Sequence, residues 1–203
     1  MAGFLVLAMA LGLFGGCKKK PVSKFAAGAP KYAILKTSKG TIKVKLFAAQ
    51  APKTVAHFIG LATGTKEWRD PRNGKMSSKP LYNGVLFHRV IPGFIVQTGD
   101  PKGDGSGAIG CVIADEFNPD LRYDRPGLLG MANSGPNTNG SQFFITLAPT
   151  PMLDGHNPIF GEVVKGLEVA KAIAAVPRDQ FREADRPLKP ILLESVTIVD
   201  KLR

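Results

Sequence analysis

The sequence predicts a mainly β domain in which the strands close into a barrel and two helices cap its ends. Short apolar runs of strand length recur along the chain, and some of them alternate apolar and polar residues. The 23 glycines and 16 prolines sit between these runs. Many strands joined by Gly- and Pro-containing turns are typical of sandwiches and barrels, not of helical bundles.

The first two predicted strands, at 32–37 and 41–47, are joined by a tight turn at 38–40. The second strand reads Thr-Ile-Lys-Val-Lys-Leu-Phe, so apolar and polar side chains alternate with a period of two. Because successive side chains of a strand point to opposite faces, we expect one face of this strand to be buried.

A first helix is predicted to begin at Pro52 and to end at Gly64, since proline suits the first helical turn and glycine the residue after the last. Its apolar residues recur at helical spacing, at Val55, Phe58, Ile59 and Ala62. His57 lies off this apolar stripe, so we expect it at the surface. A second amphipathic helix is predicted at 166–175.

The polar segment at about 65–80 is expected to be an exposed insertion, with the turn-forming sequence DPRNG at its centre. Further strands are predicted at 85–90, 94–97, 111–113, 128–132, 142–147, 159–163 and 191–199. The last of them has to pair with an early strand. Eight or so strands with two helices indicate a closed barrel capped by helices.

Length and composition indicate one soluble domain. A chain of 203 residues is long enough for one sizeable core and short for two. Its 44% hydrophobic and 21% charged residues argue against disorder and against several membrane spans. The net charge of +11 suggests an anionic partner, but only Lys18–Lys20 form a compact basic run. We therefore expect a solvated basic surface and no nucleic-acid partner. The sequence gives no sign of oligomerisation, so a monomer is the default expectation.

The N-terminus reads as an export signal. Residues 4–14 are uninterruptedly apolar, which is short of the roughly 20 residues of a membrane-spanning helix but suits a signal peptide. The sequence Phe14-Gly15-Gly16-Cys17 resembles the lipobox of bacterial lipoproteins. It departs from that pattern at Phe14, where leucine is usual, and in having no Lys or Arg before the apolar run.

We expect a signal peptide at 1–16, lipidation at Cys17 and a flexible basic tether at 17–30, followed by the domain at 31–203. The protein is then extracytoplasmic, on the periplasmic side, anchored to the inner or outer membrane by its lipid. An uncleaved N-terminal anchor and a cytoplasmic protein with an apolar tail are the alternatives.

No cofactor or metal site is expected. The histidines, His57, His88 and His156, are far apart in the sequence and none belongs to a ligand pair. After cleavage Cys111 is alone, which excludes an intrachain disulfide framework, and we expect it to be a small buried residue leading into a strand. The segment 105–110 matches GxGxxG, but it leads into a strand-like run and not into the helix that a dinucleotide site requires.

Two long motifs carry a resemblance to a known family. Residues 87–100 read FHRVIPGFIVQTGD and residues 131–145 read MANSGPNTNGSQFFI, with LDG at 153–155 and IFG at 159–161 in the same order. Over roughly 32–200 the chain resembles the cyclophilin-type peptidyl-prolyl cis–trans isomerases. The resemblance implies an eight-stranded antiparallel barrel with two capping helices, and proline-containing polypeptides as substrates.

The resemblance implies that Arg89, Phe94 and Gln97 are catalytic. Amide resonance imposes a barrier of ~18–20 kcal/mol on rotation about a peptide bond, and the barrier falls when the prolyl nitrogen loses conjugation. A cation beside that nitrogen favours the twisted transition state selectively. Arg89 matches the family's catalytic arginine, and Gln97 matches the glutamine that orients it.

The resemblance also implies a substrate-binding set, namely Ile95, Gly103, Ala132, Asn133, Gln142, Phe144, Met152, Leu153 and Asn157. Three of these depart from the usual pattern: Met152 stands where many relatives carry tryptophan, Asn157 where the groove histidine is usual, and Ile95 where methionine is usual. None of the departures removes Arg89, Phe94 or Gln97, so we expect an active enzyme.

Two other functions remain open on the sequence. A catalytically idle domain could act as a proline-peptide-binding or chaperone-like module on the cell envelope, and a structural lipoprotein could use the domain as a spacer. The intact Arg89, Phe94 and Gln97 favour the enzyme over both.

Overall fold

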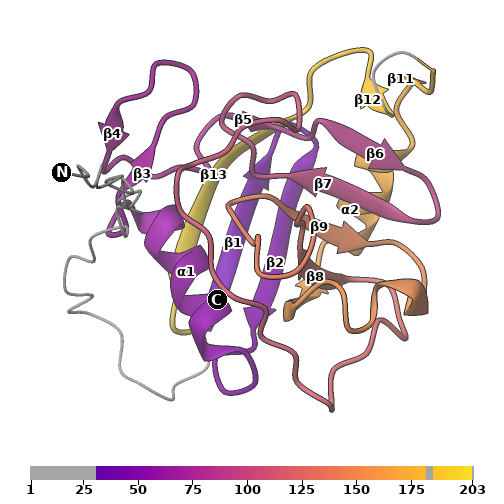
Figure 1. Ribbon diagram of the computed structural model, residues 1–203. Helices are drawn as coiled ribbons and strands as arrows, with labels where there is room; N and C mark the ends of the chain where they lie inside the picture. The colour runs from indigo at the N-terminus through magenta and orange to yellow at the C-terminus, as the bar shows by residue number, and fades with distance from the viewer. Residues whose placement is uncertain (1–30, 182–184, 203) are drawn as a thin grey trace, which may run out of the picture.

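The computed structural model of the protein describes residues 31–181 and 185–202 (Figure 1). The predicted signal peptide, the lipidation site Cys17 and the tether at 17–30 lie outside the described residues. Within the described ranges, no helix has the length and apolar character needed to cross a membrane.

The fold is built on one antiparallel sheet of nine strands, in the order β5-β13-β1-β2-β10-β8-β9-β7-β6. The early and late ends of the domain meet in it, because β13 pairs with β1 as the sequence predicts. The strands are β1 Lys31–Thr37, β2 Gly40–Leu46, β5 Val85–Leu86, β6 Arg89–Ile91, β7 Ile95–Thr98, β8 Leu128–Met131, β9 Phe143–Thr146, β10 Ile159–Lys165 and β13 Leu192–Val199.

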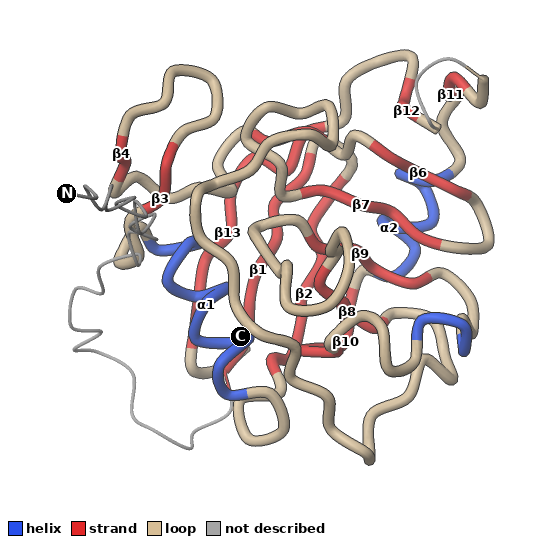
Figure 2. Tube along the Cα trace, viewed as in Figure 1, coloured by secondary structure: helices blue, strands red, loops and turns tan. Residues whose placement is uncertain are grey.

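The prediction of a closed eight-stranded barrel is wrong, because the sheet is curled but open (Figure 2). Its outermost strands, β5 and β6, do not pair with each other. The outer edge of β6 is instead covered by another segment, since Val90 N–H donates to Asp185 O at 2.9 Å. An edge whose backbone groups are partly satisfied in this way does not need a ladder to close the sheet.

Two helices pack against the sheet, α1 (Pro52–Thr63) against β13 and α2 (Leu167–Ala174) against β2 and β7 (Figure 1). Both match the predicted helices to within about a residue. Gly64 ends α1 in the left-handed conformation at φ 73°. A Cβ at this position would lie 2.3 Å from Ser78 O, so only glycine fits the turn. A short 3₁₀-helix, η1, spans Pro151–Leu153.

Two small hairpins were not predicted. In the first, β3 (Trp68–Arg69) pairs with β4 (Met76–Ser77), and in the second, β11 (Arg178–Asp179) pairs with β12 (Arg186–Pro187). The first lies inside the segment that we expected to be an exposed insertion. It is anchored to the core, because the Trp68 side chain is buried and its Nε1 donates to Lys79 O at 2.9 Å.

The predicted strand at 111–113 does not form. Within the described residues, this segment makes one isolated antiparallel bridge, between Ile113 and Asn139. Cys111 is only half-buried, not the buried residue that the sequence suggested.

The sheet is apolar on both faces where β7, β8 and β9 lie side by side. One face packs on the main core, to which Val96 and Ile145 belong. The alternating residues Ile95 and Phe144 belong to a second, smaller cluster. Because successive side chains point to opposite sides of a strand, the second cluster lies on the opposite face of these strands. This face carries the predicted site.

Candidate active site

Four predicted or neighbouring site residues form a row across four strands. Arg89 of β6 is paired with Gln97 of β7, Gln97 with Phe144 of β9, and Phe144 with Gly130 of β8. Directly paired residues of antiparallel strands project from the same face. Arg89, Gln97 and Phe144 therefore point to one side of the sheet, although they are far apart in the sequence.

The Arg89 side chain is half-buried and has no hydrogen bond or ion pair with another described residue. Its guanidinium group is a rigid, planar fork of N–H donors. Because no described residue occupies these donors, they are available to a bound ligand.

Two glutamine side chains connect the row to a neighbouring loop. Gln97 Nε2 donates to Gln142 Oε1 at 3.0 Å, and Gln142 Nε2 donates to Gly105 O at 2.9 Å. The backbone of Gln142 is held in turn, because its carbonyl accepts from Ala132 N–H at 2.9 Å. These bonds restrict the orientation of Gln97, the residue beside Arg89.

The second apolar cluster lies next to this row. Phe94, Ile95, Phe144 and Leu153 all belong to it. We call these four residues the socket, because the resemblance implies that they hold the proline ring. Tyr123 lies behind Phe144 with 5.8 Å between the ring centroids, and its hydroxyl donates to Asn157 O at 3.0 Å. Burial raises the pKa of Tyr123 well above its ordinary value, so this phenol stays neutral and keeps its donor.

A cavity of about 560 Å³ adjoins the row on the other side. Predicted residues that line it are Gln97, Ala132, Asn133 and Gln142. The segment 105–112, which includes half-buried Cys111, forms the opposite wall. None of the described residues that line the cavity carries a charge, so the cavity suits a neutral peptide segment.

Gly103 does not line this cavity, whereas Gly105 does. Gly103 is buried, and a Cβ added to it would lie 3.0 Å from the Leu86 side chain. Gly105 lies at the edge of the cavity, and its carbonyl accepts the bond from Gln142. The sequence offered several glycines in a loop of uncertain length, and only the three-dimensional contact separates them.

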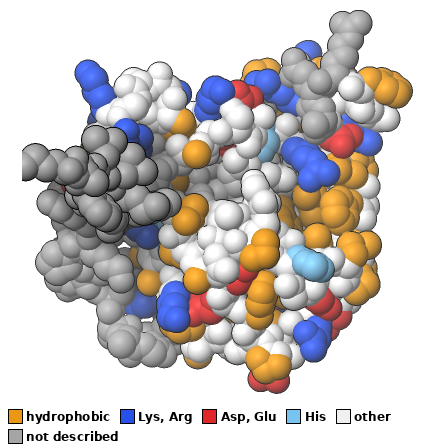
Figure 3. Space-filling model, in the orientation of Figure 1, with side chains coloured by type: hydrophobic (Ala, Val, Ile, Leu, Met, Phe, Trp, Pro, Cys, Tyr) orange, Lys and Arg blue, Asp and Glu red, His pale blue; other side chains and the backbone are white. Residues whose placement is uncertain are grey.

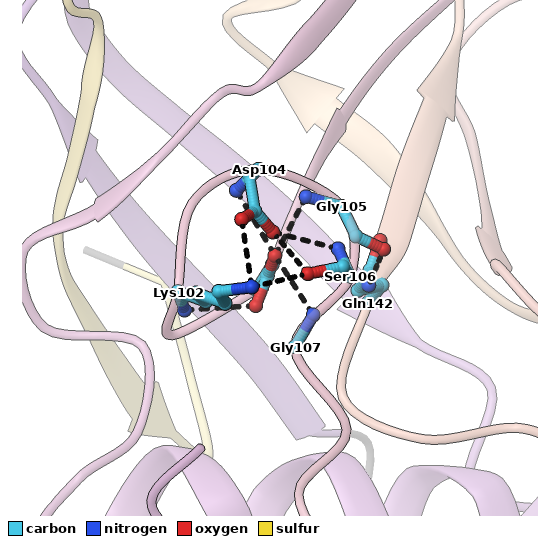
Figure 4. Close-up of polar contacts among 7 residues, drawn as sticks. Lys102, Asp104, Gly105, Ser106, Gly107 and Gln142 are labelled. Carbon is cyan, nitrogen blue, oxygen red and sulfur yellow. Dashed lines mark hydrogen bonds and ion pairs between the residues drawn. The ribbon is translucent and has the colours of Figure 1, made fainter. Parts of the chain in front are cut away.

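Figure 4 shows the polar contacts of the loop that carries Gly105. The buried Asp100 carboxylate organises this loop. Its Oδ1 accepts from Lys102 N at 2.8 Å, and its Oδ2 from three further backbone N–H groups, Asp104 at 3.1 Å, Gly105 at 2.7 Å and Gly107 at 3.3 Å. Charge-assisted bonds of this kind are about twice as strong as neutral ones. On the outside of the loop, hydrogen bonds from Ser106 and Lys102 lower the pKa of Asp104.

The remaining predicted residues lie around the socket and the cavity. Met152 is on η1 and is 65% exposed. Asn157 Nδ2 donates to Met131 O at 2.8 Å, so this side chain is occupied by the backbone. Asn133 Nδ2 donates to His156 O at 2.8 Å, and Asn133 lines the cavity.

Two histidines behind the site are buried, which the sequence did not indicate. His88 is 6% exposed, and neither of its ring nitrogens has a hydrogen-bond partner among the described residues. Desolvation lowers the pKa of His88. His57 is 3% exposed, which contradicts the surface position expected from its place off the apolar stripe.

Known proteins share this fold and these motifs. The family described as cyclophilin type peptidyl-prolyl cis-trans isomerase/CLD matches residues 32–198. Peptidyl-prolyl cis-trans isomerase B of Streptomyces anulatus is 51% identical over 169 residues, covering 82% of this chain and 95% of that protein. Peptidyl-prolyl cis-trans isomerase A of Mycobacterium tuberculosis is 49% identical over 166 residues, covering 82% and 91%.

The solved structures agree with the sequence relatives. The crystal structure of a cyclophilin type isomerase from Cryptosporidium parvum superimposes with a TM-score of 0.72 at 35% identity, covering 84% of this chain and 98% of that one. A second crystal structure of that protein, in the presence of the dipeptide Ala-Pro, gives a TM-score of 0.71. The chain therefore belongs to the cyclophilin-type peptidyl-prolyl cis–trans isomerase family.

Proposed function

We propose that this isomerase acts on X–Pro bonds of folding or unfolded envelope proteins, with Arg89 stabilising the twisted amide and the apolar socket holding the proline ring. The observation that carries the proposal is the row of Arg89, Gln97 and Phe144 on one face of the sheet. Because these residues lie on neighbouring strands, the Arg89 cation and the apolar socket are only a few strand spacings apart.

The proposed mechanism is electrostatic. As the X–Pro bond twists, the nitrogen lone pair leaves conjugation and becomes able to accept a hydrogen bond. The Arg89 guanidinium, which pairs with no described residue, can donate to it only in that state, so it stabilises the transition state more than the planar ground state. Gln97, which is held by its hydrogen bond to Gln142, keeps the Arg89 donors and the bound peptide correctly placed relative to each other.

The proposed substrate pose places the proline ring in the socket of Phe94, Ile95, Phe144 and Leu153, and the residues before it along the uncharged cavity. The related Cryptosporidium parvum isomerase has been crystallised in the presence of Ala-Pro, a dipeptide with the same bond. This supports a small X–Pro peptide as the test substrate.

The experiment is exchange NMR of a short X–Pro peptide with the full-length chain, its Arg89→Ala variant and its Arg89→Lys variant. We expect Arg89→Ala to lower catalysed exchange by at least about tenfold, as for other lost transition-state contacts. Arg89→Lys should recover only part, because it keeps the charge but loses the planar fork. Full activity in a folded Arg89→Ala variant contradicts the proposed mechanism.

We further propose that the chain is a lipoprotein on the periplasmic side of the inner or outer membrane. The apolar run at 4–14 and the following Gly-Gly-Cys sequence support this location. In bacteria fed a labelled fatty acid, the wild type should carry the label and sediment with membranes, and Cys17→Ser should do neither. A wild type that sediments without the label points to an uncleaved anchor instead.

A further inference from the structure

A buried histidine outside the groove contacts the back of the groove wall. His57 Nε2 lies 2.7 Å from Gly140 O, and His57 Nδ1 lies 2.6 Å from Lys66 Nζ. His57 comes from α1 and Lys66 from the segment that follows the helix. The imidazole therefore connects three separate segments of the chain.

The chemistry of the two partners determines the protonation of the ring. A carbonyl oxygen only accepts, so Nε2 must carry the proton that binds Gly140 O. An ammonium group only donates, so Nδ1 must present its lone pair to Lys66. His57 is thus held neutral, in one tautomer. This agrees with the lowering of the pKa of His57 to about 4, mainly by burial and also by Lys66.

The segment that His57 holds has its other side on the cavity. Gly140, Ser141 and Gln142 all line it, and a Cβ added to Gly140 would meet nothing within 4 Å. The rear of the segment is tied at two successive carbonyls, Gly140 O by His57 and Ser141 O by Tyr82 Oη at 3.1 Å. The next residue, Gln142, carries the side chain that binds both Gln97 and Gly105.

We propose that His57, set in one tautomer by Lys66, is a positioning residue that holds the 140–142 wall of the peptide groove for substrate binding. His57 touches neither the substrate nor Arg89 in this arrangement. It acts through Gly140 on the place of Gln142, and so on the shape of the cavity. The proposal rests on the proposed substrate pose, in which the peptide lies along this wall.

The test compares two substitutions of similar length that differ in one donor, His57→Gln and His57→Met, in the full-length chain. A glutamine amide can still reach Gly140 O, whereas methionine has no donor. Thr63→Val is the matched control, because Thr63 Oγ1 donates to Ile59 O at 2.8 Å on the same helix and Thr63 does not line this cavity. For each variant the catalysed exchange rate is measured against peptide concentration, together with thermal unfolding and the side-chain amide signals of Gln97 and Gln142.

We expect His57→Met to lower kcat/KM by about tenfold, as for one unmade buried hydrogen bond, with the change mostly in KM. The Gln142 side-chain signals should shift with it. His57→Gln should restore activity to within about threefold, and Thr63→Val should leave kcat and KM of the folded protein unchanged. Wild-type constants and unmoved Gln142 signals in folded His57→Met overturn the proposal.

Lys66→Met supplies a second test that keeps His57 and does not depend on how well His57→Met folds. The ring ¹⁵N signals should show a larger share of the Nδ1–H tautomer, accompanied by a rise in KM. A tautomer shift with no change in KM overturns the proposal. Failure of the Arg89 mechanism is distinguishable from failure of this proposal. It would appear as an unchanged kcat of Arg89→Ala. It would not alter the Gln142 signals or the peptide KM measured for the His57 variants.

Discussion

Arg89 and Gln97 are directly opposite each other in the β6–β7 ladder, and their side chains leave the same face of the sheet. The Gln97 side-chain amide donates to Gln142 Oε1, while the Arg89 guanidinium donates to no described residue. Among the described residues, the Gln97 side chain is thus held by a hydrogen bond and the Arg89 side chain is not. This division suits a site in which Gln97 is part of a fixed wall and Arg89 meets the ligand.

Replacing Gln97 by leucine should lower kcat/KM by about tenfold, because the change removes the hydrogen bond to Gln142 and leaves Gln142 Oε1 without its donor. Thr98→Val is the matched control on the same strand. Thr98 Oγ1 donates to Leu86 O at 2.9 Å on the core side, so its loss should cost stability and not turnover. A double-mutant cycle of Gln97→Leu with Gln142→Leu should be non-additive, since the two side chains form one interaction. Additive losses contradict the coupling.

The space behind Phe144 depends on Gly130. A Cβ at this position would lie 1.9 Å from Tyr123 Oη and 2.5 Å from the Phe144 ring. Gly130→Ala should therefore push Phe144 into the socket, lowering kcat/KM by about tenfold or more and destabilising the fold by about 1–3 kcal/mol, the usual cost of overpacking.

The double variant Gly130→Ala with Tyr123→Phe tests the cause of the lost activity and the lost stability in Gly130→Ala. Removing the hydroxyl relieves the closest contact, so unfolding temperature and activity should both recover in part. Tyr123→Phe alone should cost little activity, because the ring that supports Phe144 remains. Wild-type kinetics in Gly130→Ala contradict the assignment of Phe144 to the proline pocket.

Asp100 should control the order of the loop that carries Gly105. Asp100→Asn removes the charge and turns one acceptor into a donor facing backbone N–H groups, so we expect a loss of about 2 kcal/mol of stability. Hydrogen exchange of the amides at 102–107 should accelerate, and kcat/KM should fall as Gly105 O leaves Gln142. Asp104→Asn is the control, because this side chain lies on the exposed side of the same loop. Equal effects of the two variants contradict the role of Asp100.

Much of the fold follows from local patterns. The alternation at 41–47 and the Pro52 and Gly64 punctuation correctly predict β2 and α1, because period and capping are set by nearby residues. Closure of the sheet and the two short hairpins could not be predicted. A two-residue strand such as β5 has no period of its own, and the cover of β6 depends on Asp185, nearly a hundred residues away.

The site divides in the same way. Arg89 and Gln97 lie in the same short motif and on the two strands of one hairpin, and the second motif supplies Gln142 and Phe144. The choice of Gly105 over Gly103 and the burial of His57 depend on contacts across the fold. On an isolated helix His57 sits beside the apolar stripe, and no local signal shows that Gly140 and Lys66 cover it.

The two buried histidines should make the protein lose stability in mild acid. The pKa of His57 is lowered from 6.5 to about 4, mainly by burial, and desolvation also lowers the pKa of His88. The folded state therefore resists protons that the unfolded state takes up below its pKa. The part of the free energy of unfolding that comes from these two neutral rings is fully present above pH 6.5 and is lost as the pH falls toward 4.

For His57 the full loss corresponds to about 3 kcal/mol, at 1.36 kcal/mol per pKa unit. Urea unfolding between pH 4 and pH 8 measures it. Carboxylates also titrate in the lower part of this range, so the informative quantity is the difference between variants. His57→Gln should flatten the slope between pH 5 and 6.5. Lys66→Met should move its lower end upward in pH, because removing the ammonium raises the pKa of His57. A slope that is identical in all three proteins contradicts a neutral, buried His57.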